Sequence, residues 1–166
     1  DTQAKNGDAT KRALLGKSVA VSGNCAVVGA PPYTGATASM IPPFFVYGFD
    51  GSQWARDTTL ESPLASPSAA DQPGAAIAMD GDLIAVGSPG ADNGRGAVTV
   101  FQWRGKTSKW QQVATFLGKP DADFATSQFG AAVAVSGDLV VVGASGATSN
   151  GMTNAGAVLV YSCPAS

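Results

Sequence analysis

One pattern occurs three times along the chain, and it constrains the fold more than any other feature. The copies occupy residues 16–31, 74–89 and 130–145, so their starts lie 58 and 56 residues apart. Each copy has an apolar run, a turn of Gly followed by Asn or Asp, a second apolar run and a closing Gly. A two-residue turn of this kind between two apolar runs predicts a tight β-hairpin. Similarity at a nearly fixed spacing indicates a repeat architecture.

Two further strands complete the expected repeat. A third apolar run follows a polar loop in every copy, and in the first two copies a turn leads into a fourth run that carries Trp54 or Trp110. Four short antiparallel strands per repeat are typical of a β-propeller blade. We therefore predict an all-β fold of about three blades. The expected segments are an N-terminal linker (1–15), blade 1 (16–73), blade 2 (74–129) and blade 3 (130–166), which lacks its fourth strand.

The apolar runs also predict the core. Residues on both faces of a run are apolar, which is expected for a sheet that is covered on both sides. The side chains that we expect to be mostly buried are Val19, Val21, Val27, Ile77, Ile84, Val86, Val133, Val135, Val140 and Val142.

The copies resemble FG-GAP repeats, the blades of integrin α-subunit propellers and of many secreted or cell-surface proteins. The Phe-Gly pair stands as Phe129-Gly130, and a Gly-Ala-Pro element stands as Gly29-Ala30-Pro31. Both elements are altered in the other copies. The resemblance implies a propeller fold and an extracellular or cell-surface location. A chain that begins at Asp1 rather than Met fits a processed, secreted protein.

Composition argues against several classes of function. The chain has no histidine, which removes the commonest general base and the commonest metal ligand. We therefore expect no catalytic residues, no cofactor and a protein that is not an enzyme. A net charge of −2 without a basic cluster disfavours nucleic acid as a partner, and no apolar run is long enough to insert into a membrane.

Acidic residues are too sparse to predict a metal site. FG-GAP relatives often bind calcium through an acidic loop, but Asp92 is followed by Asn93 and lies near Arg95, while Asp121 and Asp123 stand without further acids. Calcium takes six to eight oxygen ligands, so we expect these residues to be polar turn residues and expect no bound metal.

Two functions from different classes remain. The first is a non-catalytic structural or adhesion module that assembles with other copies of itself, or with the rest of a longer propeller chain, because propellers usually close with four to eight blades. Stacked blades or added strands would give a homo-oligomer or a filament. The alternative is a lectin-like propeller that binds glycans, with Tyr33, Asn93 and Trp103 as candidate ligand contacts.

The two cysteines bear on assembly. Cys25 lies in the first copy and Cys163 in the last, each at a position that is apolar elsewhere in the repeat. We expect either two reduced, buried thiols or a disulfide that joins the two ends of the repeat array, within one chain or between chains. The third strand of blade 3 would leave an unpaired edge, which is open to strand addition.

Overall fold

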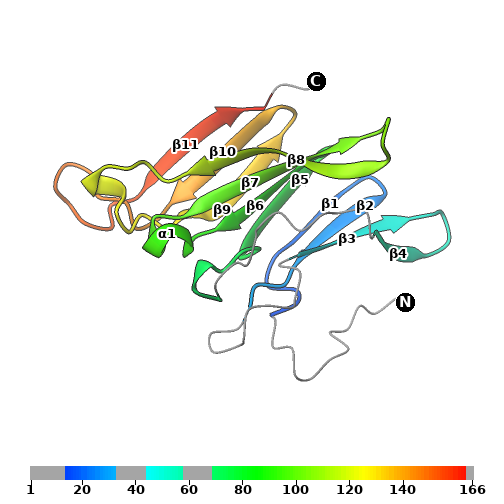
Figure 1. Cartoon of the computed structure of the whole chain (residues 1–166), viewed down its shortest axis with the longest axis horizontal. Coiled ribbons are helices and arrows are strands. Elements are labelled where there is room, and N and C mark those ends of the chain that lie inside the picture. Colours follow the sequence, from blue (N-terminus) through cyan, green and yellow to red (C-terminus); the bar gives the residue numbers. More distant parts are fainter. Residues whose placement is uncertain (1–13, 33–43, 58–68, 164–166) are drawn as a thin grey trace.

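A computed structural model describes residues 14–32, 44–57 and 69–163 of the chain. These residues form three antiparallel sheets in chain order, and the prediction of an all-β fold is confirmed (Figure 1). Blade 1 contains β1 (Val19–Ser22), β2 (Cys25–Gly29), β3 (Phe44–Phe49) and β4 (Trp54–Asp57). Blade 2 contains β5 (Ala76–Asp80), β6 (Leu83–Ser88), β7 (Ala97–Arg104) and β8 (Lys109–Leu117). Blade 3 contains β9 (Phe129–Ser136), β10 (Leu139–Ala144) and β11 (Ala157–Ser162).

Among the residues that the structure describes, helical structure is limited to three short connecting turns. They are η2 (Ala69–Asp71), α1 (Ala91–Gly94) and η3 (Ala122–Phe124). Within α1 the backbones of Asp92 and Asn93 are left-handed, with φ of 51° and 59°, so this segment is a polar turn rather than a regular helix. No helix in the described part of the chain has the length and apolarity needed to cross a bilayer.

The first two strands of every blade form the hairpin that the sequence predicts. Its turn glycines, Gly23, Gly81 and Gly137, have φ of 54°, 54° and 56°, a conformation that glycine adopts without a steric penalty. The residue after each turn glycine also holds the third strand. Its carbonyl accepts a hydrogen bond from the backbone N–H of Phe49, Trp103 or Cys163, at 2.8, 2.8 and 2.7 Å. The three blades therefore repeat the same local design.

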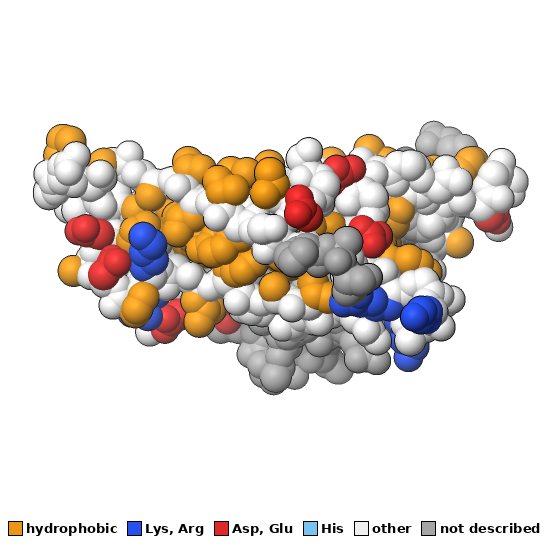
Figure 2. Space-filling view, turned by 90° about the horizontal axis from the view of Figure 1, so that it is seen from above, with side chains coloured by type: hydrophobic (Ala, Val, Ile, Leu, Met, Phe, Trp, Pro, Cys, Tyr) orange, Lys and Arg blue, Asp and Glu red, His pale blue; other side chains and the backbone are white. Residues whose placement is uncertain are grey.

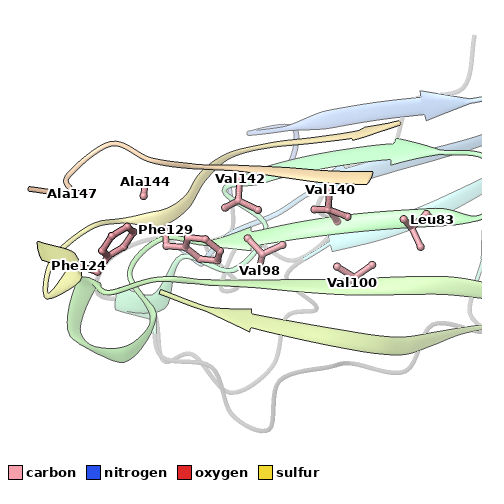
Figure 3. Close-up of a cluster of buried hydrophobic side chains, with 10 residues drawn as sticks. Leu83, Val98, Val100, Phe124, Phe129, Val140, Val142, Ala144 and Ala147 are labelled. Carbon is pink, nitrogen blue, oxygen red and sulfur yellow. The ribbon is translucent and has the colours of Figure 1, made fainter. Parts of the chain in front are cut away.

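Each junction between blades holds its own hydrophobic cluster. The cluster between blades 1 and 2 includes Val27, Phe44, Ile77 and Phe101. The cluster between blades 2 and 3 includes Val98, Val100, Val140 and Val142, which face one another across the two sheets (Figure 3). Strand β6 contributes to both clusters and is buried along its whole length, because blade 2 is covered on both faces.

Most of the predicted core is buried, with two exceptions. Val27, Ile77, Ile84, Val86, Val140 and Val142 are buried, and Val133 and Val135 pack against the cluster between blades 2 and 3. Val19 and Val21 are instead 68% and 66% exposed, so the expectation of burial was wrong for these two. They lie on the face of blade 1 that points away from blade 2, and among the described residues no blade covers that face.

Blade 3 has three strands in the part of the chain that the structure describes. Its strand order is β11-β10-β9, whereas β4 and β8 add a fourth strand to blades 1 and 2. One edge of β11 pairs with β10, and no described strand pairs with the other edge. For the chain as a whole, the absence of a fourth strand from this copy stays a prediction.

Candidate functional site: the two open blade faces

Each end blade has an apolar sheet face that no other blade covers in the described part of the chain. The N-terminal open face belongs to blade 1 and is defined by Val19 and Val21 of β1 with Ala26 and Val28 of β2, which pair with them. The C-terminal open face belongs to blade 3 and is defined by Leu139 and Val141 of β10 with Val158 and Val160 of β11. Viewed from above, hydrophobic side chains gather on the side of the molecule that carries blade 3 (Figure 2).

Comparison of repeat-equivalent positions shows what the C-terminal open face lacks. Leu139, Val158 and Val160 are 46%, 71% and 62% exposed. The equivalent residues of blade 2 are Leu83, Val98 and Val100, which are 3%, 0% and 0% exposed because blade 3 covers them. The side chains are of the same type, so the difference in burial comes from the presence or absence of the next blade.

The N-terminal open face shows the same contrast. Val19 and Val21 correspond by repeat position to Ile77 and Met79 of blade 2, which are each 9% exposed. Blade 1 covers Ile77 and Met79, and they belong to the cluster between blades 1 and 2. Each open face is therefore the repeat equivalent of one face of blade 2 that is buried in an internal junction.

A glycine near the end of the second strand lets neighbouring blades approach closely. A Cβ atom on Gly29 would overlap the carbonyl oxygen of Gly74, and one on Gly87 would overlap the carbonyl oxygen of Gly130. The equivalent glycine of blade 3, Gly143, meets only atoms of Ala132 from its own sheet. Gly143 lines a hollow of about 630 Å³ on blade 3.

Both junctions carry a hydrogen bond from the backbone N–H of a turn glycine to a side chain of the preceding blade, and at the junction of blades 1 and 2 Ser18 Oγ also donates to the carbonyl of Gly74 at 2.8 Å. The backbone N–H of Gly81 donates to Ser22 Oγ at 3.0 Å, and that of Gly137 donates to Asp80 Oδ2 at 2.8 Å. Ser22 and Asp80 occupy the same repeat position, directly before the turn glycine. Sequence analysis did not predict these hydrogen bonds between blades. One sequence feature could have indicated these hydrogen bonds. A polar residue precedes the turn glycine in all three copies, and in the third copy it is Ser136.

The three candidate ligand contacts do not form one site in the described residues. Asn93 is exposed on the turn before β7, whereas Trp103 lies near the other end of β7. Tyr33 lies outside the described residues. Trp103 packs against Trp110 with ring centroids 5.6 Å apart and borders a hollow of about 270 Å³ next to Cys25. Blade 1 repeats this pair as Phe49 and Trp54, which favours packing as the role of Trp103.

The two cysteines are free thiols on opposite faces of blade 2. Cys25 packs against the cluster between blades 1 and 2, and Cys163 packs against the cluster between blades 2 and 3. Blade 2 separates them, so they form no disulfide within the chain in this structure. Both also point away from the open faces. Burial raises the pKa of each thiol, and a nearby carboxylate (Asp57 for Cys25, Asp138 for Cys163) raises it further, so both favour the protonated form.

Two of the acidic residues considered for metal binding, Asp92 and Asp121, have other partners. Asp92 forms an ion pair with Arg95 at 2.8 Å, and Asp121 accepts a hydrogen bond from the backbone N–H of Phe124 at the start of η3. Within the ranges that the structure describes, no three His, Cys, Asp or Glu side chains cluster in a way that could hold a metal ion. The expectation of a metal-free protein stays a prediction.

Comparison with known families identifies the repeat. The family model of the FG-GAP repeat matches residues 110–161, which run from β8 to the end of β11. This segment of the chain is therefore similar to an FG-GAP repeat. The matched FG-GAP segment joins the outer strand of blade 2 to all three strands of blade 3, so its two ends lie in different sheets. A search of curated proteins gave no match. FG-GAP repeats are typical of extracellular, adhesion-type β-propeller modules.

Proposed function

We propose that this protein is a non-catalytic, extracellular structural or adhesion module whose two open blade faces bind further propeller blades. The observation that supports the proposal most directly is the contrast at equivalent repeat positions. Val98 and Val100 are fully buried under the next blade, whereas Val158 and Val160 are more than half exposed. Isolated soluble proteins seldom expose a contiguous apolar face of this kind, and such faces mark interaction sites.

The energetic gain from covering these faces is substantial. Fully burying one valine side chain stabilises a complex by about 1.5–3 kcal/mol before the costs of association are subtracted. Val19, Val21, Val158 and Val160 offer four such side chains, two on each face. No described strand pairs with the outer edge of β11, so this edge provides a second point of attachment where N–H and C=O groups can pair with an added strand.

Photo-crosslinking in the cells that make the protein tests this function. A photoreactive amino acid replaces Val160 in the C-terminal open face, and the matched control places it at Lys106, an exposed turn residue between β7 and β8. We expect the probe at residue 160, and not the one at 106, to crosslink to a chain segment with propeller-blade repeats, either from another copy or from another protein. Crosslinks only to proteins without blades, or no crosslinks at all, would contradict the proposal.

The alternative of a lectin-like propeller has less support. Asn93 and Trp103 lie towards opposite ends of β7, and Trp103 packs against Trp110, so the described residues do not combine them into one sugar-binding groove. Glycan-array binding by the wild-type chain that is lost in Trp103→Ala would favour this alternative over the assembly function.

A further inference from the structure

We infer that the partner of the C-terminal open face is a second copy of this chain, which seats its blade 1 on blade 3 in the register of the two internal junctions. This inference rests on the proposed function and names its partner. It also predicts a head-to-tail contact, because the two faces that meet are different surfaces of the same chain.

Four central apolar side chains of the junction between blades 2 and 3 have equivalents on the two open faces. At the junction of blades 2 and 3, Val98 and Val100 pack in one cluster with Val133 and Val135. Their repeat equivalents at the open ends are Val158 and Val160 on one copy and Val19 and Val21 on the other. All four equivalents are valines and all are exposed, so the second copy supplies side chains of the same kind in the same places.

The backbone of blade 1 is already shaped to fit the hollow at Gly143. At the internal junctions the glycines that approach Gly29 and Gly87 are Gly74 and Gly130, which have φ of 82° and 90°. The equivalent glycine of blade 1, Gly16, has φ of 89°. Its carbonyl can therefore enter the hollow beside Gly143 without a change in its backbone conformation.

A polar pair fixes the register of the contact. The internal junctions use Ser22 or Asp80 as acceptor and the N–H of the next turn glycine as donor. At the open ends the equivalent acceptor is Ser136 Oγ and the equivalent donor is the N–H of Gly23. Both residues are exposed, and within the described part of the chain neither has a partner of this kind.

Head-to-tail pairing also gives a blade number at which propellers close. The described residues of two copies supply six blades, which lies within the range of about four to eight blades. If the rotation between copies does not close the ring, the same contact repeats as a filament.

Two lysine substitutions allow a complementation test on the purified full chain. Val160→Lys places a charge on the C-terminal open face, and Val21→Lys places one on the N-terminal open face. Both positions are more than half exposed, so each variant should keep the wild-type circular dichroism spectrum and Tm of the dilute chain. The matched control is Gln111→Lys, at an exposed position of the outer strand β8.

We expect the wild-type chain and the control to self-associate in sedimentation and light-scattering measurements as concentration rises. Each face variant alone should associate at least about tenfold more weakly, because a buried, unpaired lysine opposes contact. An equimolar mixture of the two variants should form a dimer, because Val160→Lys keeps an intact N-terminal face and Val21→Lys keeps an intact C-terminal face.

Three outcomes would overturn the inference. A wild-type chain that stays monomeric has no second copy as partner. Variants that still self-associate use a different surface. A mixture of variants that does not form the dimer excludes a head-to-tail contact. If the purified chain is monomeric but the probe at residue 160 crosslinks in cells to another blade-containing protein, this inference fails while the proposed function stands.

Discussion

Alanine substitutions at two equivalent glycines should show whether the closing glycine is needed for close packing against the next blade or for the structure of its own strand. Gly87 and Gly143 occupy the same repeat position, and neither has a positive φ, so backbone strain does not distinguish them. At Gly87 the added Cβ would overlap the carbonyl oxygen of Gly130 in the next blade. At Gly143 the nearest atom is the Cβ of Ala132, at 3.3 Å, and a small shift accommodates it.

The expected magnitudes follow from this difference. Overpacking at a close contact costs about 1–3 kcal/mol, while replacing glycine by alanine restores about 0.4–1 kcal/mol by restricting the unfolded chain. Gly87→Ala should therefore lower the free energy of unfolding by about 1–2 kcal/mol, which corresponds to a Tm lower by about 2–8 °C in a chain of this size. Gly143→Ala should leave the Tm unchanged or raise it slightly.

Thermal unfolding followed by circular dichroism measures both effects, with dilute protein so that self-association does not contribute. Gly29→Ala is a useful companion, because the added Cβ would overlap the carbonyl oxygen of Gly74 and should behave like Gly87→Ala. Equal destabilisation by Gly143→Ala and Gly87→Ala would refute the reasoning, because the two sites would then respond to their own strands rather than to a neighbouring blade. A neutral Gly87→Ala would refute it equally.

Three further predictions concern the core, the thiols and metals. Val142→Ala, in the cluster between blades 2 and 3, should lower the free energy of unfolding by about 1–2 kcal/mol. Val158→Ala, on the open face, should change it by less than about 0.5 kcal/mol in dilute protein. Denaturant titration of both variants measures the difference. Because the pKa values of Cys25 and Cys163 are raised in the folded chain, the stability that the two thiols contribute should be fully present below about pH 8.5, the ordinary pKa of a free cysteine. It should be lost as the pH rises through the folded-state pKa values. A free energy of unfolding that stays constant across that range in a pH series of melts would contradict this. Treatment with EDTA should leave the Tm unchanged, and a fall that added calcium reverses would disprove the expectation of a metal-free fold.

For the cysteines, repeat alignment predicted the backbone position but not the direction of the side chain. The alignment places Cys163 at the position of Trp103 and Phe49, and the structure gives all three backbones the same hydrogen bond. Alignment alone did not reveal that Cys25 and Cys163 face blade 2 from opposite sides. The direction of a side chain relative to a neighbouring sheet depends on how the sheets stack, which a sequence alignment does not contain.

The repeat in the sequence determined the blades, because hairpin turns and apolar runs are local features whose energetics depend on residues close together in the chain. The turn glycines at 23, 81 and 137 and the closing glycines at 29, 87 and 143 could all be predicted from the sequence. Only the tertiary structure decided which copies of a repeated position are buried. Val19 and Ile77 read alike in the sequence, yet one is 68% exposed and the other 9%, because burial depends on whether another blade stands in front. The hydrogen bond between Asp80 and Gly137 was also decided by the tertiary structure, because it joins residues that meet only after the blades have stacked.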